Sequence, residues 1–311
     1  MINEELRAAP LWVRAAATVI RHLPAGRYRL MDFISRRPPG PFLTCLPKEF
    51  GAYSFRCDLR DSISREACFV GHYEAQETTL MCHFLKPGMC FVDVGANWGY
   101  HTLLAAYLVG KRGKVISLEP DPRLFSTLEA NVKRNGLSQV MSLQLAASNE
   151  TGILRLVGYD EKEGNFGLSH MASDNSAKNS FEVKAQTLDV LFDEVTLDKI
   201  DLLKMDIEGA EGFALQGASK ALSNHYIDRL LLELHPQLLD QHGHSAEEII
   251  ACLFELGYSA WKIDHSFAVT RKVSYNRNVD LKTLLQPFEQ ETRLDDWPHL
   301  LWLKPGLEKT W

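Results

Sequence analysis

The stretch FVDVGANWGYHT, residues 91–102, places an acid and two glycines where a run of β-favouring residues gives way to a helical pattern. Gly95 and Gly99 allow a sharp turn and a close approach to a ligand, because glycine carries no Cβ. Asp93 stands where a carboxylate can accept hydrogen bonds or face a cation. The free N–H groups at the start of the following helix add donors. This combination predicts a ligand site at the carboxyl edge of an α/β sheet.

The spacing of these residues indicates which ligand the turn accepts. A dinucleotide site carries G-x-G-x-x-G, whereas this turn reads D-x-G-x-x-x-G, which suits an ammonium or sulfonium group better than a pyrophosphate. Glu119 follows Gly99 by 20 residues and ends the next predicted strand, where a carboxylate can accept both hydroxyls of a ribose. A ribose joined to a cationic amino acid describes S-adenosylmethionine, which we predict as the cofactor. The alternative is an ordinary turn followed by a chance acid.

Two further strand ends carry groups that can move a proton. Asp206 ends the run KIDLLKMD, and His235 follows the run DRLLLEL. An alcohol that accepts a methyl group keeps its proton far above neutral pH, so a general base is expected in the transition state. His235 has an ordinary pKa near neutrality, and Asp206 is the alternative base or a holder of the sulfonium side of the cofactor. In the competing interpretation, Asp206 caps the next helix and His235 is a turn residue before a proline.

The acids that follow Asp206 have less specific roles. Glu208 is either a functional carboxylate or a helix-capping acid, and Glu211 is expected to pair with Lys204 as a solvated ion pair. Acids and a histidine gathered at one edge can also bind Mg²⁺, which takes carboxylate oxygens. The spacing does not require a metal, so we predict none.

These residues need a sheet that brings several strand ends together. Apolar runs typical of buried strands alternate with amphipathic helical patterns, which indicates a parallel sheet covered on both faces. Residues 160–180 connect the two strands of an expected β-hairpin. This segment is polar and is expected to form either a lid or an inert loop. The expected strands are residues 89–95, 114–120, 139–147, 199–207, 228–236, 258–264 and 299–305, with the hairpin at 151–158 and 181–187. The expected helices are residues 3–22, 73–85, 100–110, 121–137, 211–222 and 245–257.

Several stretches together resemble one known family. The turn described above, the upstream GHYEAQET, the segment KMDIEGAE, the strand end LLELHP and the stretch QTLDVLF are similar to the FkbM-type S-adenosylmethionine-dependent methyltransferases. The resemblance runs from about Gly51 to Leu234. It implies an α/β fold with the doubly wound, mostly parallel, seven-stranded sheet of the Rossmann-like class I methyltransferases. It also implies O-methylation of hydroxyls on sugars, glycolipids or natural products.

The resemblance implies roles for individual positions as well. It places Glu119 at the ribose of the cofactor and Glu74 near the methionine ammonium. The adenine is expected beside Ala147 and Ser148. The residues expected to border the methionine end are Asp93, Gly95, Asn97 and Gly99.

The charge of the chain limits its partners. The 311 residues carry a net charge of −6, which argues against a nucleic-acid substrate. Residues 1–40, by contrast, hold seven arginines and three acids. We therefore predict a basic helical extension, residues 1–45, ahead of a methyltransferase domain, residues 46–311. The extension packs on that domain, or it touches an anionic membrane surface or the second subunit of a homodimer.

The sequence also bears on location and on competing functions. No apolar run reaches the roughly 18 residues that span a bilayer, and Arg7 and Arg14 interrupt the N-terminal apolar pattern, so we expect a cytoplasmic protein. The six cysteines include no CxxC pair, which indicates reduced thiols. Two other functions stay open: N-methylation on the same fold, and cofactor binding without catalysis. The glycine spacing excludes a nicotinamide oxidoreductase.

Overall fold

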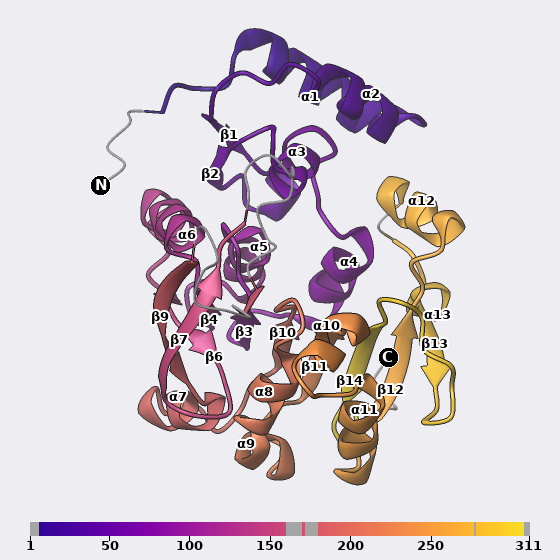
Figure 1. Ribbon diagram of the computed structural model, residues 1–311. Coiled ribbons are helices and arrows are strands. Elements are labelled where there is room, and N and C mark those ends of the chain that lie inside the picture. The colour runs from indigo at the N-terminus through magenta and orange to yellow at the C-terminus, as the bar shows by residue number, and fades with distance from the viewer. Residues whose placement is uncertain (1–5, 160–169, 172–179, 277, 308–311) are drawn as a thin grey trace.

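The computed structural model describes residues 6–159, 170–171, 180–276 and 278–307. Within these residues the central sheet has eight strands (Figure 1). Strand β10 pairs in parallel with β3 and β11, and β4 pairs in parallel with β3 and β5, whereas β14 runs antiparallel to both of its neighbours. In spatial order the strands are β13 (Leu285–Phe288), β12 (Ser259–Ile263), β14 (His299–Leu303), β11 (Arg229–Glu233), β10 (Leu202–Met205), β3 (Cys90–Val94), β4 (Lys114–Leu118) and β5 (Val140–Leu143).

The seven strands predicted for the sheet are all present, so the α/β fold with a mostly parallel sheet is confirmed. The sheet has one more strand than expected, because β13 adds to β12 at the edge in antiparallel register. Pro287 lies within β13. Proline is tolerated on an edge strand because the outer side of that strand has no neighbour that needs an N–H donor. A proline within a segment is nevertheless atypical of strands, so the sequence did not predict β13.

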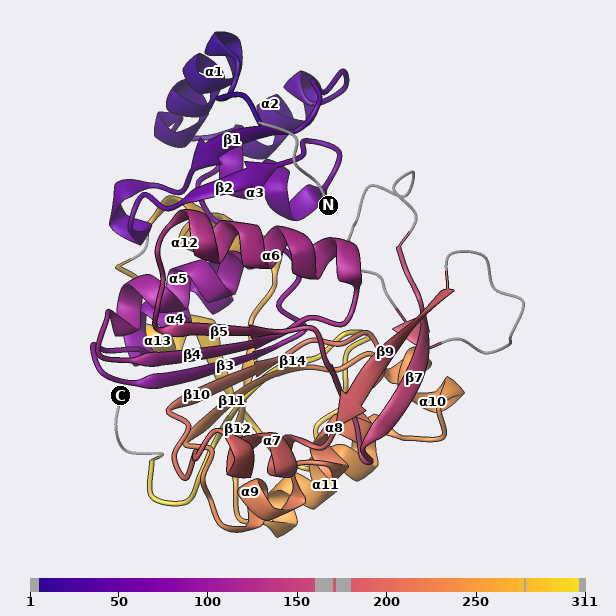
Figure 2. The same ribbon diagram turned by 90° about the vertical axis from the view of Figure 1, so that its left-hand side faces the viewer.

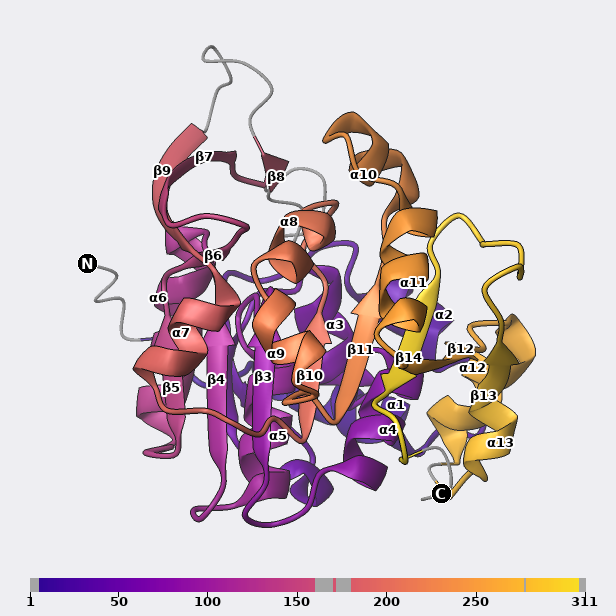
Figure 3. The same cartoon turned by 90° about the horizontal axis from the view of Figure 1, so that it is seen from below.

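Helices cover both faces of the sheet, as Figure 2 shows edge-on and Figure 3 shows from one face. The side chains of β3 alternate between these two layers: Phe91 belongs to one apolar cluster, and Val92 and Val94 belong to the other. The layer on the side of Phe91 contains α4 (Ala75–Phe84), α5 (Tyr100–Val109) and α6 (Pro122–Arg134). The opposite layer contains α7 (Leu188–Glu194), α8 (Glu211–Gln216), α9 (Ser219–Ser223) and α11 (Ala246–Glu255).

Two helices differ from their predicted extent. The helix expected over residues 211–222 is divided into α8 and α9 at Gly217, where a Cβ would lie 2.0 Å from the carbonyl oxygen of Ser148. Residues 3–5 of the helix expected over residues 3–22 lie outside the described residues, and in the described part the helix α1 (Leu11–His22) begins directly after Pro10. Pro10 occupies the N-cap, where its missing N–H costs nothing.

Smaller elements frame the central layers. The predicted hairpin is confirmed as β7 (Gly152–Val157) and β9 (Ser180–Gln186), which pair in antiparallel register. They form a second sheet with β6 (Ala146–Ala147) and β8 (His170–Met171). Apart from β8 and Ser180, the segment at residues 160–180, expected to be a lid or an inert loop, lies outside the described residues. The C-terminal half adds the helices α10 (Pro236–Gln241), α12 (Phe267–Tyr275) and α13 (Leu281–Leu284).

The N-terminal segment packs on the rest of the chain. Helix α1 buries Val13, Ala17 and Ile20 in the same apolar cluster as Phe91 of the central sheet, while Leu11 and Trp12 are exposed. The division at residue 45 and the partner of this basic segment stay predictions. The other elements here are α2 (Arg27–Ile34), β1 (Phe42–Cys45), the 3₁₀ helix η1 (Lys48–Phe50), β2 (Ser54–Cys57) and α3 (Ser62–Phe69). Among the described residues, every helix is too short or too polar to cross a bilayer.

The turn after β3 depends on a missing side chain, which stability measurements can test. Gly95 has φ +88°, and a Cβ there would lie 2.0 Å from the carbonyl oxygen of Asp206. Gly95→Ala should therefore lower the free energy of unfolding by at least about 3 kcal/mol, from backbone strain and steric overlap together. Urea unfolding of the cofactor-free protein measures the loss.

Gly136→Ala is the matched control, because Gly136 also has a positive φ, +62°, but faces open space. It should cost about 1 kcal/mol from backbone strain alone. Equal losses for the two variants would contradict the close approach of the β3 turn to the end of β10.

Candidate active site

A pocket opens where β3, β4 and β10 end. Its open volume is about 1130 Å³, solvent at the mouth included. The β3–α5 turn contributes Gly95 and Asn97 to the wall, β4 contributes Glu119, and the end of β10 contributes Asp206. The carboxyl ends of parallel strands meet at one edge, so residues far apart in the sequence face the same space.

Glu119 presents a buried carboxylate to this pocket. Its Oε2 accepts a hydrogen bond from the Asn97 backbone N–H at 2.7 Å, and its Oε1 accepts one from the Asp121 N–H at 2.8 Å. Burial raises the pKa of Glu119 to about 8, although these two bonds work in the opposite direction. Each carboxylate oxygen accepts more than one hydrogen bond, so both keep capacity for the two hydroxyls of a ribose.

The two glycines of the turn serve chain packing more than ligand approach. A Cβ on Gly95 would meet the backbone of Asp206, and a Cβ on Gly99 would lie 2.6 Å from Leu128 Cδ1. Gly95 lies on the pocket wall, whereas Gly99 is not among the described residues that form it. Asn97 adopts φ +53° and bonds its own side-chain oxygen to the next backbone N–H, 2.6 Å away. Asn97 is thus held rigidly beside Glu119.

Asp93 and Glu74 lie behind the wall of the pocket. Asp93 is 1% exposed, and its Oδ2 accepts a hydrogen bond from Thr102 Oγ1 at 2.7 Å. Burial raises the pKa of Asp93 to about 6. Glu74, at φ +42°, points its Oε2 to within 3.5 Å of His101 Nε2 and 3.7 Å of Lys204 Nζ. Their direct contact with a cofactor stays a prediction, since each is engaged by neighbouring side chains.

Lys204 is a central charge that the sequence analysis did not assign to the site. It lies on the pocket wall, 5% exposed, with its Nζ 3.3 Å from Asp206 Oδ2. Burial alone would lower the pKa of the Lys204 ammonium, but the carboxylates of Glu74 and Asp206 outweigh it and raise the pKa well above its usual range. The available signal was a lysine inside the buried strand LLKM, because charged side chains are rarely fully buried unless they are paired.

His235 lies at the centre of an acidic group at the ends of β10 and β11. Its Nδ1 is 3.1 Å from Glu211 Oε1, and its Nε2 is 3.5 Å from Glu208 Oε2 and 3.6 Å from Glu233 Oε1. Burial would lower the pKa of His235, but the hydrogen bond and charge of Glu211 reverse this and raise it to about 9. The raised pKa favours the protonated imidazole at neutral pH, and the role of His235 as the general base stays a prediction.

Glu211 also differs from expectation. It is fully buried, and its Oε1 accepts hydrogen bonds from the backbone N–H groups of Ile207 and Gly209, at 3.3 and 3.2 Å, in addition to its contact with His235. Lys204 pairs with Glu74 and Asp206 instead. The predicted solvated pair between Glu211 and Lys204 is wrong, because the turn after β10 folds Glu211 inward toward β11.

Glu208 and Asp206 are the two carboxylates that reach the pocket wall near His235. Burial raises the pKa of Glu208 to about 7. Burial also acts to raise the pKa of Asp206, but the charges of Lys204 and His235 prevail and lower it. Glu208 thus titrates near neutrality while Asp206 stays ionised, and a general base works best when its pKa lies near the operating pH.

The opposite end of the pocket is largely apolar. Ala147 and Ser148, expected near an adenine, lie on the wall next to Leu145, Leu154 and Leu156. A flat apolar ring system fits between such side chains. At the other end, Asp206, Glu233 and His235 place one possible metal-ligand atom each within 4.8 Å of one another, although both ring nitrogens of His235 already face carboxylates.

The mostly parallel sheet with a pocket at its carboxyl edge is the class I methyltransferase fold, whose cofactor is S-adenosylmethionine. The family model described as "Methyltransferase FkbM domain" matches residues 93–260, more than half of the chain. The chain therefore belongs to the FkbM methyltransferase family, which confirms the resemblance stated above.

The chain is also similar to individual methyltransferases. Methyltransferase 1 of Beauveria bassiana is 29% identical over 163 residues, which cover 46% of this chain and 63% of that protein. Methyltransferase sdnD of Sordaria araneosa is 30% identical over 159 residues, or 42% of this chain and 60% of the relative. This chain thus spans less than two thirds of either relative. The crystal structure of the FkbM methyltransferase from Methylobacillus flagellatus KT is 17% identical, with a TM-score of 0.41 over 78% of this chain and 55% of that chain.

The raised pKa values predict how stability depends on pH. Glu119, Glu208 and His235 have pKa values of about 8, 7 and 9 in the folded protein, above their ordinary values of 4.5, 4.5 and 6.5. The folded state therefore binds more protons than the unfolded state between about pH 5 and 9, and the free energy of unfolding should fall as pH rises through this range. Urea unfolding of the cofactor-free protein at several pH values measures the slope.

Replacement of Glu208 measures how much of this pH dependence of stability comes from that carboxylate. Glu208→Gln removes a titrating carboxylate and should flatten the decline between about pH 5 and 7. Stability that is constant or rises from pH 5 to 9 in the wild type would contradict the protonation states described for this site.

Proposed function

We propose that the protein transfers a methyl group from S-adenosylmethionine to a hydroxyl of a sugar, glycolipid or natural product. The observation that carries this proposal is the position of Glu208, a carboxylate on the pocket wall with a pKa of about 7. An alcohol keeps its proton far above pH 7 and needs a base in the transition state, whereas a neutral amine already offers a lone pair. N-methylation and cofactor binding without catalysis are the alternatives.

The residues present fit the cofactor. Glu119, buried at the wall with free acceptor capacity, would hold the ribose, and the apolar wall at Ala147 would hold the adenine. The turn at Gly95 and Asn97 would border the amino-acid end, and the ionised Asp206 would face its positive charge. When bound, S-adenosylmethionine supplies a methyl group already activated by a sulfonium.

The remaining task for the protein is to orient the acceptor and take its proton. Glu208 is the proposed base, and its Oε2 receives the proton of the acceptor hydroxyl. The charged His235 contacts Glu208 on one side and the buried Glu211 on the other, 3.5 and 3.1 Å away. His235 is then a positioning residue that keeps Glu208 oriented and limits the rise of its pKa.

Replacement of the proposed base should slow chemistry without weakening cofactor binding. Glu208→Gln should lower kcat by about 10²–10⁴-fold, leave the KM for S-adenosylmethionine unchanged and remove the rise of kcat with pH near 7. The measurement is release of S-adenosylhomocysteine in a screen of hydroxylated sugars and natural-product scaffolds. The exposed Glu150 provides the control Glu150→Gln, which should retain full activity. A Glu208→Gln variant with wild-type rate and pH profile would remove Glu208 from the mechanism.

Cofactor binding is tested separately at Glu119. Glu119→Ala removes two hydrogen bonds to the ribose and should weaken S-adenosylmethionine binding at least about tenfold. Isothermal titration calorimetry measures the affinity, and Glu129→Ala, on the exposed side of α6, is the control. Unchanged affinity in Glu119→Ala would refute the ribose role.

A further inference from the structure

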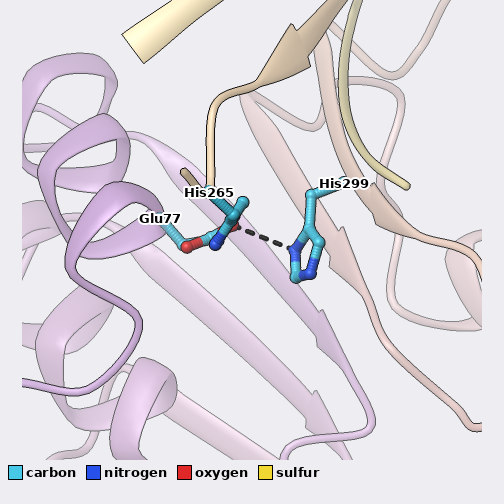
Figure 4. Close-up of side chains that lie close together, drawn as sticks. All are labelled: Glu77, His265 and His299. Carbon is cyan, nitrogen blue, oxygen red and sulfur yellow. Dashed lines mark hydrogen bonds and ion pairs between the residues drawn. The ribbon is translucent and has the colours of Figure 1, made fainter. Parts of the chain in front are cut away.

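A second group of functional side chains lies beside the pocket. Glu77 comes from α4, His265 follows β12, and His299 is the first residue of β14. Figure 4 shows that the three side chains converge although they come from three separate elements. The residues that line the methyltransferase pocket do not include any of the three, so this group needs its own explanation.

Both histidines contact the same carboxylate oxygen, Glu77 Oε1. Glu77 Oε1 lies 2.8 Å from His265 Nε2 and 3.1 Å from His299 Nδ1. The two imidazole rings are 4.0 Å apart, centre to centre, with 32° between their planes. One ligand-type atom from each residue lies within 4.8 Å of the other two. We propose that Glu77, His265 and His299 bind a divalent metal ion of the zinc type.

The second oxygen of Glu77 points independently to a ligand. Glu77 is 2% exposed, yet its Oε2 is buried without a hydrogen-bond partner among the described residues. A buried polar atom without a partner is costly and uncommon. A small cavity borders Glu77, His299 and Glu233, so there is space next to this carboxylate. A cation bound by both oxygens of this carboxylate would also satisfy the free Oε2.

The second ring nitrogen of His299 faces a carboxylate, as is usual for histidines that bind metals. Its Nε2 lies 3.5 Å from Glu233 Oε1, while its Nδ1 faces Glu77. Histidines that ligate metals through one nitrogen usually direct the other to a carboxylate, which fixes the ring and increases its basicity. Glu233 would thus orient His299 with its proton on Nε2 and its lone pair on Nδ1.

The ligand set indicates which metal. Two imidazoles and one carboxylate are a ligand set of zinc sites that keep an open position, whereas Mg²⁺ and Ca²⁺ take oxygen ligands. Metal–ligand bonds of about 2.1 Å in a tetrahedron place neighbouring ligand atoms roughly 3.3 Å apart. Glu77 Oε1 lies 2.8 Å from His265 Nε2 and 3.1 Å from His299 Nδ1. Side-chain shifts of a few tenths of an ångström would bring these distances to the value for a metal site. The side chain of His265 is 33% exposed, so water can reach the fourth position.

The proposed ion would connect distant parts of the chain. His265 is 188 residues from Glu77 in sequence, and the ion would join α4 to the C-terminal strands β12 and β14. Glu74, which pairs with Lys204 at the methyltransferase pocket, lies one helical turn before Glu77. The metal would thus hold the start of α4 against the sheet. This proposal rests on the geometry of the three ligands and does not depend on the proposed methyl acceptor.

Titration of ZnCl₂ into the EDTA-treated, full-length protein tests the site by calorimetry. The wild type should bind one equivalent, and His265→Ala, which changes a partly exposed side chain, should weaken binding by at least about tenfold. His83→Ala removes an exposed histidine from the same helix α4 and should bind zinc as the wild type does. Zinc should also raise the melting temperature of the wild type and of His83→Ala more than that of His265→Ala.

Other results would overturn the proposal. They are wild-type affinity in His265→Ala, the absence of saturable binding to the wild type, or zinc binding that is lost in His235→Ala and kept in His265→Ala. Crystals of the wild type soaked with zinc give a test that needs no variant. Anomalous density among Glu77, His265 and His299 supports the site, and its absence there contradicts it.

Discussion

The buried ammonium of Lys204 is the charge on which the arrangement of the site depends. It comes from the middle of the sheet, and the carboxylates of Glu74 and Asp206 lie within 3.7 and 3.3 Å of it. Removing one member of such a group would leave uncompensated buried charge, which is strongly destabilising. Lys204 therefore couples the start of α4 to the end of β10 and helps to fix this part of the pocket wall.

Burial at the carboxyl edge of the sheet positions these groups and also sets their protonation. Desolvation raises the pKa of Glu119 and Glu208. It would lower the pKa of His235, but the three carboxylates around the ring raise that pKa instead. The roles of acid, base and positioning residue thus follow from which partners each strand end meets. Perturbed pKa values in a cleft are typical of functional sites, and here they separate Glu208 from the ionised Asp206.

The sequence was sufficient for features that depend on local pattern and insufficient for those that depend on distant contacts. Apolar runs located seven strands, and the acid at the second strand end, Glu119, could be placed because parallel strand ends converge. The edge strand with Pro287 lacks a strand pattern. The pKa of His235 depends on Glu211, 24 residues earlier, folding inward. The group formed by Glu77, His265 and His299 joins residues whose spacing carries no motif, so only the folded chain brings them together.

The proposed activity requires a nucleoside donor that lies across the ends of β3, β4 and β10 with its ribose on Glu119. A crystal structure of the protein with S-adenosylmethionine is the most direct test. The account predicts ribose hydroxyls within hydrogen-bond distance of both Glu119 carboxylate oxygens and the adenine beside Ala147. Ordered cofactor at another place on the protein, or a ribose turned away from Glu119, would contradict it.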